Sequence, residues 1–231
     1  LNNPDSPLGH HWQDATHITF GVATIGFRYK IFKLDGSVFT GREPGEARYG
    51  FDQATFDSYS YRLSINPSPS WSLQVSKAFL KSPEAIHPGT DVDRTTASVA
   101  HALPMTGVNH SLISVLVRGY NNSGKDHREH SITCEANLQL DRTAIYGRYE
   151  NIQKSADELL LDQFSDHTLF HINALTLGLN YILLRELNTN FALGAHATFY
   201  HADSTLDPIY GSNPYSAQVY IRISPAIMTA Q

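Results

Sequence analysis

The fold is decided by the stretch Trp71-Ser72-Leu73-Gln74-Val75-Ser76-Lys77-Ala78-Phe79. Large apolar side chains recur in it at odd-numbered positions, namely Trp71, Leu73, Val75 and Phe79. Successive side chains of a β-strand leave opposite faces of a sheet. The period of two therefore predicts a strand with one apolar face and one more polar face.

The same alternation recurs along the chain and predicts eleven strands. They cover residues 17–29, 31–41, 55–66, 71–80, 94–103, 110–120, 130–140, 143–151, 170–184, 189–201 and 215–224. Short links lie at residue 30 and at 66–70, 104–109, 141–142 and 185–188, and long links at 42–54, 81–93, 121–129, 152–169 and 202–214. In bacterial outer-membrane barrels, short turns face the periplasm and long loops face outside. The alternation of link lengths predicts an all-β, antiparallel up-and-down transmembrane β-barrel whose C-terminus lies in the periplasm.

The number of predicted strands bears on how the barrel closes. Single-chain bacterial outer-membrane barrels have an even number of strands, and eleven is odd. We therefore expect this sequence to be the C-terminal part of a larger, even-stranded barrel. The predicted organisation is a single outer-membrane β-barrel domain over residues 1–231, with a loop at 1–16, strands and loops at 17–224 and a periplasmic tail at 225–231.

Composition excludes several other classes. The formal net charge is -5 and no basic stripe occurs, which argues against a nucleic-acid partner. Charged residues make up 17% of the chain, below the roughly 25% of an ordinary soluble domain. Cys134 is the single cysteine, so neither an intrachain disulfide nor a zinc site built on several cysteines is possible. No apolar run approaches the ~18 residues of a membrane helix.

The apolar faces of the predicted strands carry aromatic residues near both ends. In two strands these aromatics are eight residues apart, Trp71 to Phe79 and Phe191 to Phe199, which at ~3.3 Å per residue and ~40° tilt climbs ~20 Å. That height is close to the ~25 Å apolar band of a membrane barrel. The predicted aromatic girdle consists of Trp71, Phe79, Tyr181, Phe191, Phe199 and Tyr215. The alternative is a soluble β-sandwich in which this apolar face is the core.

The opposite faces are polar and partly charged, which predicts a water-filled or internally paired lumen. The candidate pore-lining residues are Arg62, Glu135, Arg148, Glu150, His196, Gln218 and Arg222. A porin-like channel for passive diffusion of small hydrophilic solutes is the function that this face favours. The alternative is that the charges pair across the lumen and plug it, leaving a structural or surface-interaction barrel whose outer loops bind a partner. Outer-membrane lipid is a predicted partner in both cases, and an oligomer or a partner protein is left open.

Metal binding and catalysis have weak support in the sequence. His10, His11, Asp14 and His17 are the metal candidates, but their spacing matches no rigid ligand motif, so no metal and no cofactor is predicted. Adjacent histidine and serine residues at 110–111 and 130–131 point to opposite faces of a strand, and no catalytic set emerges. The sequence therefore does not predict an enzyme. Residues 156–164 are expected to form one or two helical turns, packed on the rim or folded into the lumen.

Several segments resemble an uncharacterised family of Gram-negative outer-membrane β-barrel, porin-like proteins. The similar segments are Asp14-Ala15-Thr16-His17-Ile18-Thr19-Phe20-Gly21-Val22, Gly41-Arg42-Glu43-Pro44, Asn66-Pro67-Ser68-Pro69-Ser70-Trp71-Ser72-Leu73-Gln74-Val75, Asp93-Arg94-Thr95-Thr96-Ala97-Ser98 and Tyr210-Gly211-Ser212-Asn213-Pro214. The resemblance runs from about His10 to Ser224. It implies the outer-membrane barrel fold and further strands ahead of this region, and it implies no substrate.

Overall fold

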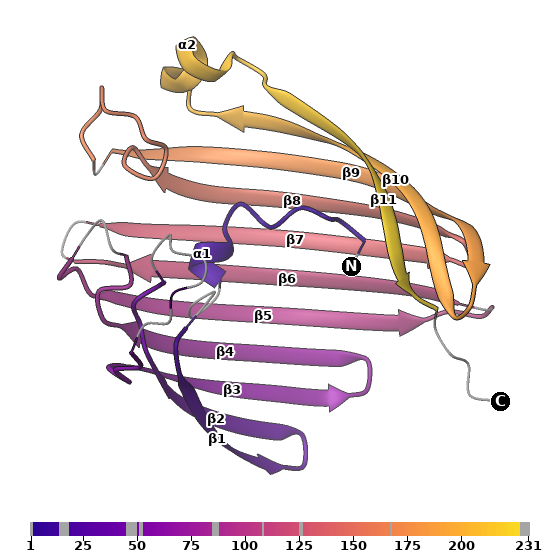
Figure 1. Cartoon of the computed structure of the whole chain (residues 1–231), viewed down its shortest axis with the longest axis horizontal. Helices are drawn as coiled ribbons and strands as arrows, with labels where there is room; N and C mark the ends of the chain where they lie inside the picture. Colours follow the sequence, from indigo (N-terminus) through magenta and orange to yellow (C-terminus); the bar gives the residue numbers. More distant parts are fainter. Residues whose placement is uncertain are drawn as a thin grey trace.

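Eleven strands form one antiparallel sheet in which every strand lies beside its neighbour in the sequence (Figure 1). The computed structural model describes residues 2–13, 19–44, 50, 53–84, 88–107, 109–124, 127–166 and 168–226. The strands are β1 (Val22–Tyr29), β2 (Phe32–Phe39), β3 (Ser58–Ser68), β4 (Trp71–Leu80), β5 (Val92–Pro104), β6 (His110–Asn122), β7 (Arg128–Leu140), β8 (Thr143–Ser155), β9 (Leu169–Glu186), β10 (Thr189–Ala202) and β11 (Tyr215–Pro225). The predicted all-β, up-and-down architecture is confirmed.

Most strand ends differ from the prediction by one to three residues, and the two largest differences, in β1 and β8, have identifiable reasons. β1 begins at Val22 rather than at 17, because Gly21 before it has a φ of 99°, outside the β region, and packs where a Cβ would lie 2.7 Å from the Ala54 side chain. β8 continues to Ser155 rather than 151, because its last residues pair with β9 as far as Leu169. The link predicted at 152–169 accordingly shortens to 156–168.

Three short helical segments lie in regions predicted as loops. They are α1 (His10–Gln13) within the predicted loop 1–16, and η1 (Ser204–Leu206) with α2 (Asp207–Tyr210) within the predicted loop 202–214. At 156–164 the structure has isolated turns, with the Leu159 N–H donating to the Ser155 carbonyl and the Leu160 N–H to the Asp157 carbonyl, and these turns do not continue into a helix. Leu160 has a φ of 54°, and a left-handed residue cannot continue a right-handed helix. Among the described helices, none is long and apolar enough to span a membrane.

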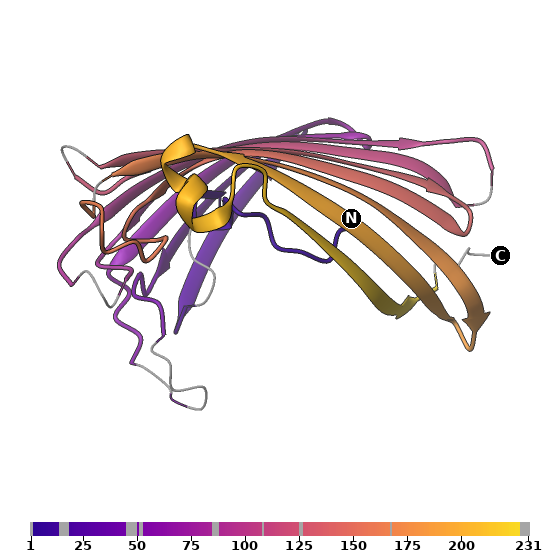
Figure 2. The same cartoon turned by 90° about the horizontal axis from the view of Figure 1, so that it is seen from above.

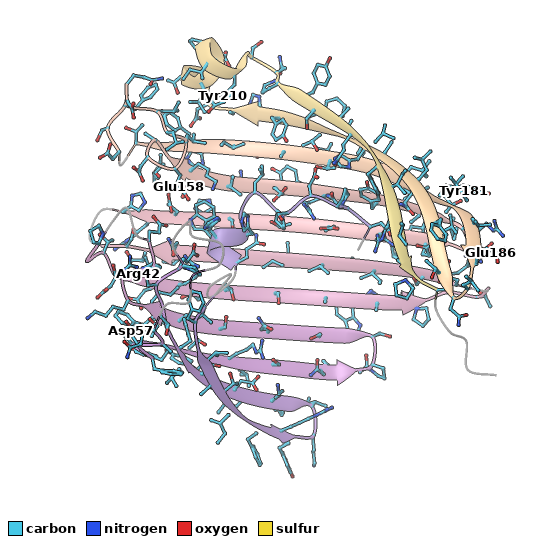
Figure 3. All side chains as sticks on the ribbon, in the orientation of Figure 1. Arg42, Asp57, Glu158, Tyr181, Glu186 and Tyr210 are labelled. Atoms are coloured by element: carbon cyan, nitrogen blue, oxygen red, sulfur yellow. The ribbon has the colours of Figure 1, made fainter. Side chains whose placement is uncertain are left out.

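The two ends of the sheet differ, as the link lengths predict. Figure 1 shows the short turns gathered at one end and the long loops with α1 and α2 at the other. In Figure 3, Arg42, Asp57 and Glu158 lie at the long-loop end, and Tyr181 and Glu186 at the short-turn end. The sheet is strongly curved, and its concave side holds the N-terminal segment (Figure 2). Within the described residues β1 and β11 each pair with one neighbour only, so the sheet is open here.

Apolar side chains cover the convex face and polar ones the concave face. In β10, Phe191, Leu193 and Phe199 are exposed, whereas His196 and Thr198 on the opposite face are buried. Two small apolar clusters lie at the long-loop end of the molecule. One is formed by Phe39, Ala78, Leu80 and Val92, and the other by Ala156, Leu161, Phe170 and Leu206. The second cluster packs the 156–164 segment on the rim, and the apolar face that a soluble sandwich would bury is uncovered.

Candidate functional site

The candidate site is the concave face, where buried charges are held in pairs. The Arg148 Nε donates a hydrogen bond to Glu135 Oε2 at 2.8 Å, and both side chains are less than 10% exposed. These residues face each other across β7 and β8 in register, which is why the sequence places them together. On β2 and β3, Asp35 accepts from Lys33 at 2.9 Å and from Arg62 at 3.1 Å. A charge in a low-dielectric wall needs such a partner, so these pairs stabilise the polar face.

Residues 2–13, here called the strap, lie on the concave side of the sheet (Figure 2), where they contact β7, β8, β10 and β11, and α1 at the end of the strap packs against β5, β6 and β7. At one end of the strap, the Asn2 Nδ2 donates to Asn137 Oδ1 at 2.8 Å and the Asn2 carbonyl accepts from the Tyr220 hydroxyl at 3.2 Å. The Asn2 side chain also accepts from the Arg222 guanidinium. This end of the strap is therefore tied to two strands, β7 and β11.

The middle of the strap is held by the charged residues of the wall. Asp5 lies 2.9 Å from His196 Nε2, and its carbonyl accepts from Arg148 at 2.8 Å. The Leu8 backbone N–H donates to the Glu150 carboxylate at 2.7 Å. Backbone groups of the strap form the hydrogen bonds with Arg148 and Glu150. Any strap sequence that follows the same path could therefore form these two hydrogen bonds.

The far end of the strap is anchored by α1 near the long-loop end. Trp12 is 1% exposed, and its indole N–H donates to Glu129 at 2.8 Å. The Lys154 ammonium lies 4.1 Å from the centre of the Trp12 ring, a cation–π contact. The next residue, Gln13, donates to Thr133 at 2.7 Å. An aromatic anchor at one end and polar contacts along the rest fix the strap to the wall.

Two glycine–tyrosine pairs shape the wall next to the strap. Gly178 faces Tyr146 and Gly194 faces Tyr220 in register. A Cβ on either glycine would lie 2.2 Å from the tyrosine Cζ, so each ring lies flat over its glycine. The two tyrosine hydroxyls are 3.0 Å apart, and the Tyr146 hydroxyl is 3.3 Å from His196 Nδ1. The glycines thus position a tyrosine–histidine network directly under Asp5 of the strap.

A cavity of about 350 Å³ opens at the long-loop end beside Trp12. Its wall includes Glu84, Glu129, His127 and Glu158. The hydrogen bond with Glu129, 3.3 Å away, raises the pKa of His127 above its usual value despite partial burial. Burial raises the pKa of Glu158 to about 7, with the Glu129 and Glu84 carboxylates adding to the effect. The cavity therefore gathers groups that change charge near neutral pH.

The titration of this cavity predicts that stability falls as the pH rises. The folded-state pKa of Glu158 lies above its ordinary 4.5, so its contribution is complete below about pH 4.5 and is lost as pH rises through about 7. The raised pKa of His127 acts with the same sign, complete below about 6.5 and lost above it. We expect the urea midpoint of the wild type to fall across this window. In Glu158→Gln the part of the fall below pH 7 should disappear; an unchanged profile would contradict the assignment.

A second hollow, of about 320 Å³, lies on the concave face beside the end of the strap, where Gln13 forms part of its wall. Short hydroxylated side chains from five neighbouring strands line it, namely Thr24, Ser37, Ser60, Ser76 and Thr96. Asp35 and Arg62 stand at its side. Arg62 keeps 44% of its side chain exposed. This hollow, here called the open trough, offers water and solutes a polar surface with a few fixed charges.

The structure places all seven candidate pore-lining residues on the concave face. Five of them, Glu135, Arg148, Glu150, His196 and Arg222, contact the strap or pair beneath it. Arg62 lies in the open trough, and Gln218 faces His196 in register. The girdle residues lie on the convex face, with Trp71 44% and Phe199 53% exposed.

The metal candidates are only partly described. His10 and His11 belong to α1 with ring centres 4.3 Å apart, whereas Asp14 and His17 lie outside the described residues. In the part of the chain that the structure describes, no group of three or more histidine, cysteine or acidic side chains is arranged to hold a metal ion.

The strap was not predicted from the sequence. Its one signal is Trp12, a large aromatic residue in an otherwise polar stretch.

No family model and no curated protein sequence matches this chain. Among solved structures it is similar to a loop L8 deletion mutant of OmpT, an outer membrane protein of Vibrio cholerae, with a TM-score of 0.56 and 8% sequence identity. The match covers 96% of this chain and 69% of that one. At such low identity the similarity shows the fold alone, and the fold is that of an outer-membrane β-barrel. The narrower resemblance to an uncharacterised porin-like family stays a prediction.

Proposed function

We propose that this protein lies in a bacterial outer membrane, with its C-terminal strand running toward the periplasm. The exposed apolar convex face and the outer-membrane barrel fold support this location. The long loops with α1 and α2 then face outside, and the short turns face the periplasm.

The function we propose is a porin-like channel for passive diffusion of small hydrophilic solutes, without enzymatic activity. The observation that carries it is the open trough of about 320 Å³, lined by hydroxyl groups and running beside the strap. Hydroxyl side chains can replace part of a solute's hydration shell without holding it tightly, which is what conduction requires. Lys33 and Arg62 are both more than 40% exposed beside one carboxylate, Asp35, so this stretch of wall favours anionic over cationic solutes.

The channel is tested by planar-bilayer conductance of the purified full-length protein. Ser76→Trp puts a large ring into the trough and is expected to lower the single-channel conductance by about half, because a narrower pore conducts less. Val75→Trp adds the same ring to the convex face and should leave the conductance unchanged. A wild type without conductance, or equal conductance in the two variants, would overturn the proposal.

A plugged barrel is the second candidate, favoured by one specific observation. The strap contacts β7, β8, β10 and β11, and the charged groups beneath it are paired. If further wall surface closed over the open trough, the lumen would be filled and the outer loops would be left to bind a partner. Absence of conductance together with a folded, protease-resistant barrel would select this function.

A further inference from the structure

Five basic side chains gather on the convex, apolar face close to its long-loop end. They are Lys77, Arg118, Arg128, His130 and His171. The strand register places four positions in one row, because Lys77 pairs with Thr95, Thr95 with Tyr120 and Tyr120 with His130. Neighbouring strands lie ~4.8 Å apart, so this row sets Lys77 and His130 roughly 14 Å apart on one face. Arg118 lies between them on β6.

Three cations of this patch, Lys77, Arg118 and Arg128, have no ion-pair partner in the part of the chain that the structure describes. On the convex face of β4 to β8, Asp93 supplies the one carboxylate, in the row above Lys77. Charged residues on the lipid face are strongly unfavourable at the bilayer midplane and far less so near the interface. Three cations without an ion-pair partner among the described residues, placed near the membrane–water interface, therefore favour an anion supplied from outside the protein.

An apolar groove of about 280 Å³ leads away from this patch toward the middle of the convex face. Its walls come from β3 to β6 and include Leu63, Leu73, Val75 and Leu116, with Arg118 at its edge. The hollow forms because the small Ala97 stands in register between Val75 and Arg118. A groove that is almost wholly apolar and touches a guanidinium at one side is complementary to an amphiphile with an anionic headgroup.

We propose that the convex face of β3 to β7 binds a phosphorylated lipid of the outer leaflet. The phosphate lies over Lys77, Arg118 and Arg128, where guanidinium groups can bind two of its oxygens at once. One acyl chain lies in the groove over Ala97. The orientation agrees with the long loops facing outside, since the headgroup lies toward the loops and the chain points to the membrane centre. A free phosphate ion would leave the groove unused. This inference rests on the proposed outer-membrane location and is independent of conductance.

Native mass spectrometry of the detergent-solubilised full-length protein tests the site. We expect diphosphoryl lipid A to bind more tightly than phosphatidylcholine, and excess inorganic phosphate not to displace it. The double variant Lys77→Gln/Arg118→Gln should bind lipid A about tenfold or more weakly, since each cation near a lipid headgroup contributes about 1 kcal/mol. The matched control Lys30→Gln/Arg142→Gln removes two exposed cations at the short-turn end and should bind as the wild type does.

A second variant separates the chain from the headgroup. Ala97→Phe fills the groove and keeps every cation, so it should weaken lipid A binding severalfold while the exposed position leaves folding intact. Equal affinity for lipid A and phosphatidylcholine, or equal binding in the double variant and its control, overturns the proposal. If the protein binds lipid A but does not conduct, the channel alone is contradicted. If it conducts but binds lipid A no more tightly than phosphatidylcholine, this lipid site alone is contradicted.

Discussion

Replacing Arg148 by methionine is expected to lower the free energy of unfolding by about 3–5 kcal/mol, because the change leaves a buried carboxylate without its cation. Glu135 is 7% exposed, and its Oε1 has no hydrogen-bond partner among the described groups even in the wild type. The same substitution removes the hydrogen bond from Arg148 to the Asp5 carbonyl of the strap. Urea unfolding in lipid vesicles, followed by tryptophan fluorescence, measures the loss.

Two further variants test whether the loss of unfolding free energy comes from the buried ion pair. Arg148→Met/Glu135→Leu removes both charges and should recover most of the loss, because an apolar pair carries no desolvation cost. Arg62→Met removes a cation from the same concave face, but Arg62 is 44% exposed and Asp35 keeps Lys33 at 2.9 Å. That control should cost about 1 kcal/mol or less. Equal losses for Arg62→Met and Arg148→Met would show that burial does not set the cost.

Much of the fold could be predicted from the sequence because a barrel wall is a local pattern. Alternation around Val75 gives a strand, and the length of the links gives the pairing, since neighbouring strands in the chain are neighbours in the sheet. The register also follows locally, because a one-residue shift would turn every apolar side chain inward. The convex or concave side of each strand residue could therefore be predicted from parity alone.

The strap could not be predicted because its contacts are almost all far away in the sequence. Asn2 meets Asn137 and Arg222, and Asp5 meets His196, across separations that no local pattern reports. The turns at 156–164 do not extend into a helix for a related reason. Leu161 and Phe164 pack against Phe170 and Leu206, and this tertiary packing together with the left-handed Leu160 outweighs the local preference for helix.

Releasing the strap is expected to raise the conductance about twofold, because the strap contacts β7, β8, β10 and β11, α1 packs against β5, β6 and β7, and the conducting area grows with the wall that is left open. Trp12→Ala/Asp5→Asn removes the buried anchor, worth about 3–5 kcal/mol for a tryptophan, and the charge that faces His196. Trp71→Ala is the matched control, since this tryptophan lies on the convex face, 44% exposed. In a Trp71→Phe background, Trp12 is the single tryptophan, and its fluorescence reports whether the strap is docked. An undocked strap with unchanged conductance would mean that solutes do not pass along the wall of β7 to β11, and the open trough would then be the whole of the path.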